Sequence, residues 1–187
     1  MRVTMGAALA AAVFLQAAAL TGGSALAAGE SPDAASAKDE IAALKAEIET
    51  LKGKLPTQAH AMIDVEYNFA NLWFAGKAGN WPLAAFYLNE TKNRIAWAVR
   101  VSPQRTLSTG QKLDLAPMME AITESSIPEM GKALTAKDHK AFETAYRHAM
   151  GECYACHEAA ERPFLKPHIP EAPEARVIAM DPNAPAP

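Results

Sequence analysis

Residues 137–161 read KDHKAFETAYRHAMGECYACHEAAE, and this segment decides the class of fold that the sequence predicts. Small and apolar side chains recur along it at spacings of three and four, at Phe142, Ala145, Ala149, Cys153, Cys156 and Ala160. An α-helix repeats about every 3.6 residues, so this spacing places them all on one face of a helix. The segment is therefore predicted to be an amphipathic helix that buries this face against other parts of the chain.

Three segments that precede it have the same periodicity. They cover about residues 57–76, 80–102 and 114–136. Asn80 is predicted to cap the second segment, with Pro82 in its first turn. Each of the three is therefore expected to form a helix with one apolar stripe.

Ser125, Ser126 and Pro128 interrupt the third of these segments, and we expect them to break or kink its helix. Residues 102–110 are predicted to form a loop, and no alternating segment or Asn-Gly turn indicates a β-strand. Helical stripes need one another for burial, and short connections favour antiparallel neighbours. The fold class predicted for residues 56–162 is therefore all-α, an antiparallel four-helix bundle.

The composition agrees with this fold class. Of the 187 residues, 50% are hydrophobic but only 7% are aromatic, and strands favour β-branched and aromatic residues. The formal net charge is −3, so the chain has no broad basic surface for binding phosphate groups. Nucleic acid is therefore not expected as a partner.

Residues 1–27 have the pattern of a secretory signal peptide. Arg2 precedes an apolar run over residues 7–20, and small residues at Ala25 and Ala27 form a cleavage site near Ala27. The run is shorter than the roughly 20 residues that a membrane-spanning helix needs. The mature protein is therefore expected to be periplasmic, and not an integral membrane protein after cleavage.

Residues 28–55 are predicted to form a linker, over residues 29–35, and then a short coiled-coil-like helix. The apolar residues of this helix follow a heptad repeat, at Ala37, Ile41, Leu44, Ile48, Leu51 and Leu55. Isoleucine at one core position and leucine at the other favour a parallel two-stranded coiled coil, which would make the protein a homodimer. The run is short for a coiled coil, and the alternative is a single amphipathic helix that folds against its own domain.

Residues 163–187 form a proline-rich tail. They contain seven of the 13 prolines of the chain. Proline has no amide hydrogen to donate and breaks helices, so the tail is expected to be extended. Either it lies over the domain or it stays disordered.

Both cysteines of the chain lie in the motif Cys153-Tyr154-Ala155-Cys156-His157. A C-x-x-C-H run is the signature of covalent haem attachment. On a helix, Cys153 and Cys156 project to nearly the same side and can each bond a haem vinyl group, while His157 can ligate the iron. The sequence therefore predicts one covalent haem c, with His157 as the proximal iron ligand.

A C-x-x-C pair has two other interpretations, a redox disulfide and part of a zinc site. A thioredoxin-like pair would lie near a βαβ pattern, which the sequence lacks. A zinc site would need further Cys or His residues at paired spacing, and none of His60, His139, His148 and His168 forms a second close pair with a cysteine. Covalent haem is the interpretation that agrees with the rest of the sequence.

A C-x-x-C-H motif on the last helix of an exported all-α chain resembles the cytochrome c′ family of four-helix-bundle haem proteins. The resemblance covers about residues 57–162. It implies that Cys153 and Cys156 hold the haem, that His157 ligates the iron, and that the first helix of the bundle covers the distal face. The candidate distal residues on that helix are His60, Met62 and Phe69.

The sixth iron ligand decides between two functions. A second protein ligand suits electron transfer, whereas an open position suits small gases such as NO, CO or O₂. The sequence shows no other catalytic groups, so the protein is predicted to transfer electrons in the periplasm, with a redox partner protein that the sequence does not identify. The alternative is binding or sensing of a gas ligand at an open distal site. A haem enzyme is less favoured, because only His60 among the distal candidates offers acid–base chemistry.

Overall fold

The structure is a computed structural model that describes residues 32–175 and 177–185. The predicted signal peptide, residues 1–27, lies outside the described residues. Within the described ranges the chain is mostly helical, with a small two-stranded sheet, so the all-α prediction is confirmed. None of the helices in these ranges is long and apolar enough to cross a membrane.

The contacts divide the chain into two units, one that ends at Ile48 and one that begins at Glu49. Helix α1 (Pro32–Lys54) carries the predicted heptad seam. The helix begins at Pro32, so it includes residues 32–35, which were predicted to belong to a linker. Proline suits the first turn of a helix, where its missing amide would have no partner, and the alanines that follow have the highest helix propensity.

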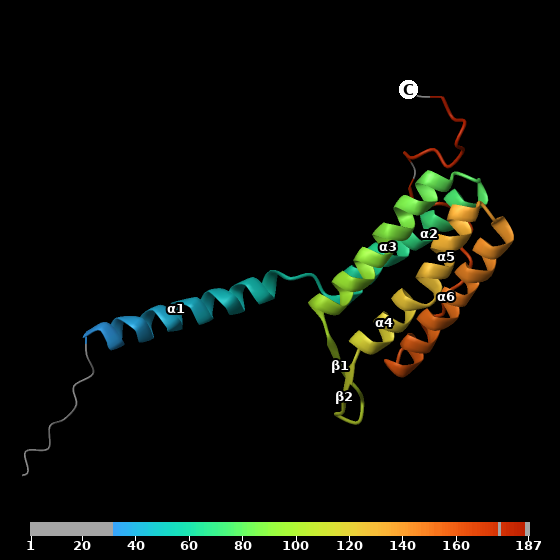
Figure 1. Cartoon of the computed structure of the whole chain (residues 1–187). Coiled ribbons are helices and arrows are strands. Elements are labelled where there is room, and N and C mark those ends of the chain that lie inside the picture. The colour runs from blue at the N-terminus through green and yellow to red at the C-terminus, as the bar shows by residue number, and fades with distance from the viewer. Residues whose placement is uncertain (1–31, 176, 186–187) are drawn as a thin grey trace, which may run out of the picture. The chain divides into compact units, whose positions relative to one another are not determined.

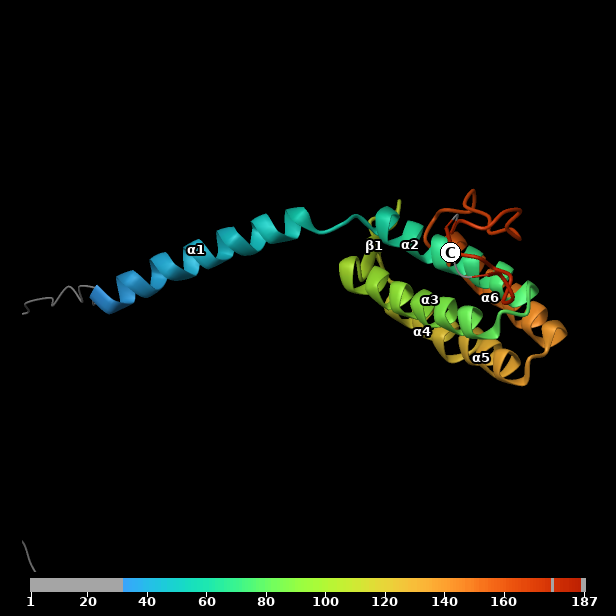
Figure 2. The ribbon, with the colours of Figure 1, turned by 90° about the horizontal axis from the view of Figure 1, so that it is seen from above.

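Helices α2 (Gln58–Lys77) and α3 (Trp81–Val101) form an antiparallel pair and lie side by side along their lengths (Figures 1 and 2). The Thr57 hydroxyl accepts a hydrogen bond from an amide in the first turn of α2. Asn80 caps α3 in the same way, as the sequence predicted. In the turn between the helices Gly79 has a φ of +70°, which glycine adopts without steric cost.

A short antiparallel hairpin follows α3. Its strands are β1 (Gln104–Thr106) and β2 (Lys112–Asp114), and Arg105 pairs with Leu113. The prediction of a loop without strands over residues 102–110 was therefore wrong for β1. Each strand has only three residues, which is too short for an alternating pattern to be recognised in the sequence.

The third predicted helix consists of two helices, α4 (Ala116–Glu124) and α5 (Ser126–Ala136). They are separated at Ser125, whose φ of −108° and ψ of −87° are not helical. The hydroxyl of Ser125 donates to the Ala121 carbonyl in the preceding turn, at 2.7 Å. The interruption predicted from Ser125, Ser126 and Pro128 is confirmed.

Helix α6 (His139–Ala159) completes the helical part of the second unit. It packs against α2, α4 and α5, while α3 packs against α2, α4 and α5 (Figures 1 and 2). The apolar faces of these helices form the core, whose largest fully buried side chains include Tyr146, Phe142, Leu72 and Met130. The stripe that the sequence predicted on residues 137–161 is thus the face of α6 that contacts the core.

The described residues after α6 form no further helix or strand, and part of this tail lies against α2 (Figure 2). The Ala175 amide donates to Asn71 Oδ1 at 2.8 Å, and both residues are buried. Ile169 and Met180 also pack against the core. Of the two alternatives for the tail, contact with the domain is therefore the one observed for these residues.

Candidate functional site

The motif Cys153-Tyr154-Ala155-Cys156-His157 lies in the last two turns of α6. Both cysteines are free thiols, and both contact the hydrophobic core. Cys156 is 8% exposed, and Cys153 is partly buried. The helix therefore brings the two thiols to one side, as the spacing predicted.

The surroundings disfavour ionisation of both thiols. Burial, with smaller contributions from the Cys156 and Glu152 charges, raises the pKa of the Cys153 thiol to about 12. Burial also raises the pKa of the Cys156 thiol. In the part of the chain that the structure describes, no group of three His, Cys, Asp or Glu residues is placed to hold a metal ion.

The imidazole of His157 is oriented by the chain that follows α6. Its Nδ1 lies 2.7 Å from the carbonyl oxygen of Leu165, to which it can donate its proton. Glu161 turns the backbone with a φ of +57°, and the Arg162 amide donates to the His157 carbonyl at 2.7 Å. A histidine whose Nδ1–H is held by a carbonyl presents the lone pair of Nε2 as a ligand. No feature of the sequence indicated the role of Leu165.

The β1–β2 hairpin holds the C-terminal end of α6 in place. Arg105 Nε donates to the Ala160 carbonyl at 2.5 Å. The amide and hydroxyl of Ser108 donate to the two carboxylate oxygens of Glu161, at 2.7 and 2.6 Å. These hydrogen bonds lower the pKa of the Glu161 carboxyl. Sequence reasoning missed this contact because the two segments are more than 50 residues apart in the chain.

Helix α2 packs against the core face of α6. The ring of Phe69 stacks on Tyr146, with centroids 4.1 Å apart, and the Tyr146 hydroxyl donates to the Phe69 carbonyl at 3.0 Å. The two helices run antiparallel, since Gly76, later in α2, meets Phe142, earlier in α6. Met62 lies about two turns before Phe69, and Cys153 lies about two turns after Tyr146. Met62 is therefore placed on α2 at the level of the cysteines.

The structure separates the three distal candidates. Met62 and Phe69 are partly buried and pack against the core. His60 is exposed, and its Nδ1 lies 3.0 Å from the Thr57 hydroxyl. It comes two residues before Met62, which places it on nearly the opposite side of α2. Only Met62 and Phe69 are brought to the α6 side.

Glu152, which precedes the motif, connects α6 to the break between α4 and α5. Its carboxylate accepts hydrogen bonds from the hydroxyls of Ser125 and Ser126. His148 lies one turn earlier on α6, and its Nδ1 is 3.0 Å from Oε2 of Glu129 on α5. Its pKa is raised, first by the hydrogen bond to Glu129 and then by the charge of Glu152. These groups fix the position of α6 against α4 and α5.

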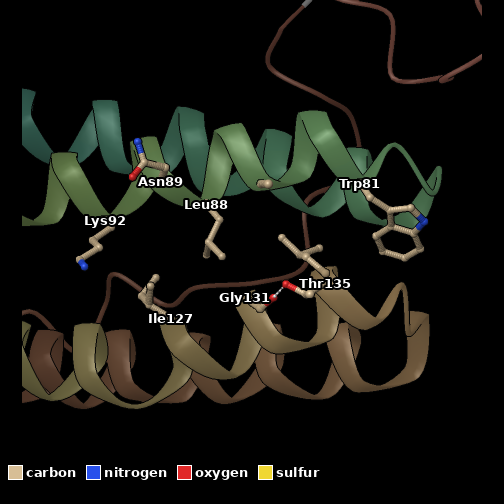
Figure 3. A pocket seen from close by; sticks show the side chains of 9 residues that line it. Trp81, Leu88, Asn89, Lys92, Ile127, Gly131 and Thr135 are labelled. Carbon is tan, nitrogen blue, oxygen red and sulfur yellow. Dashed lines mark hydrogen bonds between the residues drawn. The ribbon is translucent and has the colours of Figure 1, made fainter.

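Two pockets lie away from the motif. One, of about 360 Å³, lies between α3 and α5 and is lined by Trp81, Leu88 and Lys92 among others (Figure 3). The other, of about 500 Å³, lies between α2 and α3 and is lined in part by Tyr67 and Arg94. Neither lining contains a cysteine or histidine. The motif is therefore the stronger candidate site.

Comparison of the chain with protein-family models, curated proteins and solved structures gave no match.

Proposed function

We propose that the chain is an exported monohaem c-type cytochrome that carries electrons in the periplasm. Cys153 and Cys156 bind the haem covalently, and Nε2 of His157 ligates its iron. One observation carries the proposal: two free thiols share one side of α6, directly before a histidine whose Nδ1 is held by the Leu165 carbonyl. When bound, the haem supplies reversible one-electron exchange at iron.

Two free thiols on one side of α6 suit attachment. Each thiol adds across one vinyl group, so that its sulfur and its hydrogen bond to the two vinyl carbons and no group leaves. The Nδ1 hydrogen bond of His157 selects the tautomer whose Nε2 is free to bind metal.

The arrangement of the second unit supports an antiparallel four-helix bundle similar to cytochrome c′, with α4 and α5 together as the third member. The helices α2, α3, α4–α5 and α6 contact one another as neighbours, and α2 runs antiparallel to α6. In this bundle α6 holds the motif, and α2 covers the distal side of the haem. Met62, which packs against the core, is the side chain of α2 that we propose as a second iron ligand, as an electron carrier would use.

A specific observation also favours the second candidate function, gas binding at an open distal position. His60, the strongest ligand among the distal candidates, is exposed and contacts Thr57. The side chains that α2 presents at this level, Met62 and Phe69, are uncharged and apolar. If the Met62 sulfur does not bind the iron, these apolar side chains suit a small neutral ligand such as CO or NO.

The first experiment tests covalent attachment. The full chain is produced with its own N-terminal residues in a bacterium that matures exported c-type cytochromes, and the purified protein is extracted with acidified organic solvent. We expect the colour to stay with the protein, and the alkaline pyridine spectrum to show two thioether bonds. Cys153→Ser should shift this spectrum to that of a single thioether. A colourless product, or complete extraction of the pigment, would refute the proposal.

The second experiment tests the ligand and the two functions. His157→Ala should remove the normal ferric spectrum, while the matched control His148→Ala, a histidine on the same helix, should preserve it. Electron paramagnetic resonance of the ferric protein then reports the spin state. A low-spin signal supports an electron carrier with two protein ligands, whereas a high-spin signal with immediate CO binding to the ferrous protein supports the gas-binding alternative.

A further inference from the structure

Helix α1 presents an exposed row of apolar side chains. Ile41, Leu44, Ile48 and Leu51 are 48% to 53% exposed. They repeat at spacings of three and four, so they lie along one stripe of the helix. An exposed row of large aliphatic side chains marks an interaction surface rather than an ordinary solvent-facing helix.

The charges beside this row identify what covers it. With Ile41 and Ile48 at heptad position a and Leu44 and Leu51 at position d, position e holds Lys38, Lys45 and Lys52. Position g holds Asp33, Glu40 and Glu47, followed by Lys54 at the end of the helix. In a parallel two-stranded coiled coil, each g residue faces the e residue five positions later in the other strand. Glu40 would then face the partner's Lys45, and Glu47 the partner's Lys52. Asp33 would likewise face the partner's Lys38.

The antiparallel arrangement is disfavoured by the same charges. It would pair g with g and e with e, which brings most of the g carboxylates together along one edge and the e ammonium groups together along the other. Isoleucine at a with leucine at d also favours two parallel strands. We propose that α1 is a dimerisation helix, which forms a parallel two-stranded coiled coil with α1 of a second copy of this chain.

The helix is long enough for this role but not for a tight complex. It has 23 residues, which is about three heptads. In the isolated helix Lys52 pairs with Glu49 at 2.7 Å, and both side chains are largely exposed. An exposed pair of this kind is weak, so Lys52 can exchange it for the partner's Glu47. We therefore expect a dimer that dissociates on dilution.

The test uses charge reversal in the mature full chain, measured by sedimentation velocity over a range of concentrations. Glu40→Lys with Glu47→Lys makes both edges positive, and Lys45→Glu with Lys52→Glu makes both edges negative. Each double variant should self-associate at least about tenfold more weakly than the wild type. An equimolar mixture of the two should dimerise again, because the edges become complementary.

A matched control keeps the change of net charge but moves it to the outer face of the helix. Asp39→Lys with Glu49→Lys should dimerise as the wild type does. Orientation is read from Ala37→Cys at a d position, which should form a disulfide between copies only in the parallel coil. All substituted side chains are exposed, and circular dichroism verifies that each variant is folded.

Three outcomes would overturn the inference. A wild-type chain that stays monomeric at all concentrations would exclude it. A monomer that co-sediments with anionic lipid vesicles through the same row would assign the row to a membrane surface. A dimer that is unchanged in both charge-reversed variants would locate the interface elsewhere. The measurement is of mass, so it stands apart from whether the protein binds haem.

Discussion

Replacement of Gly76 by alanine should destabilise the packing of α2 against α6. A Cβ atom at residue 76 would lie 2.3 Å from Cε1 and 2.5 Å from Cζ of Phe142. Carbon atoms in ordinary contact are at least about 3.5 Å apart, so the ring or the helix must move by about 1 Å. The ring cannot move freely, because Phe142 is fully buried between Trp73 and Tyr146.

The magnitude follows from two opposing effects. Overpacking a core typically costs about 1–3 kcal/mol, whereas exchange of glycine for alanine within a helix gains about 0.5–1 kcal/mol. We expect a net loss of about 1–2 kcal/mol, which lowers the melting temperature by roughly 2–8 °C for a domain of this size. Unfolding is followed by far-ultraviolet circular dichroism in denaturant and on heating.

Gly151→Ala is the matched control, since no atom within 4 Å would meet the added Cβ. It lies within α6 and should be neutral or stabilising. Phe142→Leu provides the second control, because a smaller side chain at residue 142 should relieve part of the Gly76→Ala penalty. A Gly76→Ala variant as stable as the wild type, or a double variant with purely additive losses, would refute the contact between Gly76 and Phe142.

Three further predictions concern the distal side, the hairpin and the tail. Met62→Leu keeps the volume but removes the thioether sulfur, so CO should bind the ferrous protein faster by on the order of tenfold; an unchanged rate in stopped flow would remove Met62 as an iron ligand. Ser108→Ala weakens the hydrogen bonding that lowers the pKa of Glu161 below its ordinary value of 4.5. That stabilisation is present above about pH 4.5 and is lost as the pH falls through the folded-state pKa, so the melting temperatures of variant and wild type should differ at about pH 7 and converge near pH 3. Asn71→Ala leaves the buried Ala175 amide without its acceptor, at a cost of about 1–3 kcal/mol, and limited proteolysis should cut the tail earlier than in the wild type.

The helices were predictable because their apolar stripes are long. The N-cap at Asn80 and the interruption near Ser125 were also predictable, since both depend on local side-chain chemistry. The hairpin was not, because three-residue strands leave almost no periodic signal. Helix α1 begins earlier than predicted, at Pro32. The alanines that follow Pro32 have a high helix propensity, which the prediction of a linker did not take into account.

The site was predictable in its motif but not in its surroundings. The spacing of Cys153, Cys156 and His157 places them together on any helix. The different positions of Met62 and His60 could also be predicted from the sequence. They lie two residues apart on one helix, so they point in nearly opposite directions. The Leu165 carbonyl could not be anticipated, because it reaches His157 through a left-handed turn at Glu161, which residues other than glycine rarely adopt.

The clamp between the β1–β2 hairpin and the end of α6 joins two regions that would otherwise fray independently. Helix ends and short hairpins are usually among the first places where amides exchange with solvent. Here the Ser108 amide is bonded to Glu161, and the Arg162 amide that follows is bonded to His157. Deuterium should therefore enter both amides at a common rate, as one cooperative opening that loosens His157 and the hairpin together.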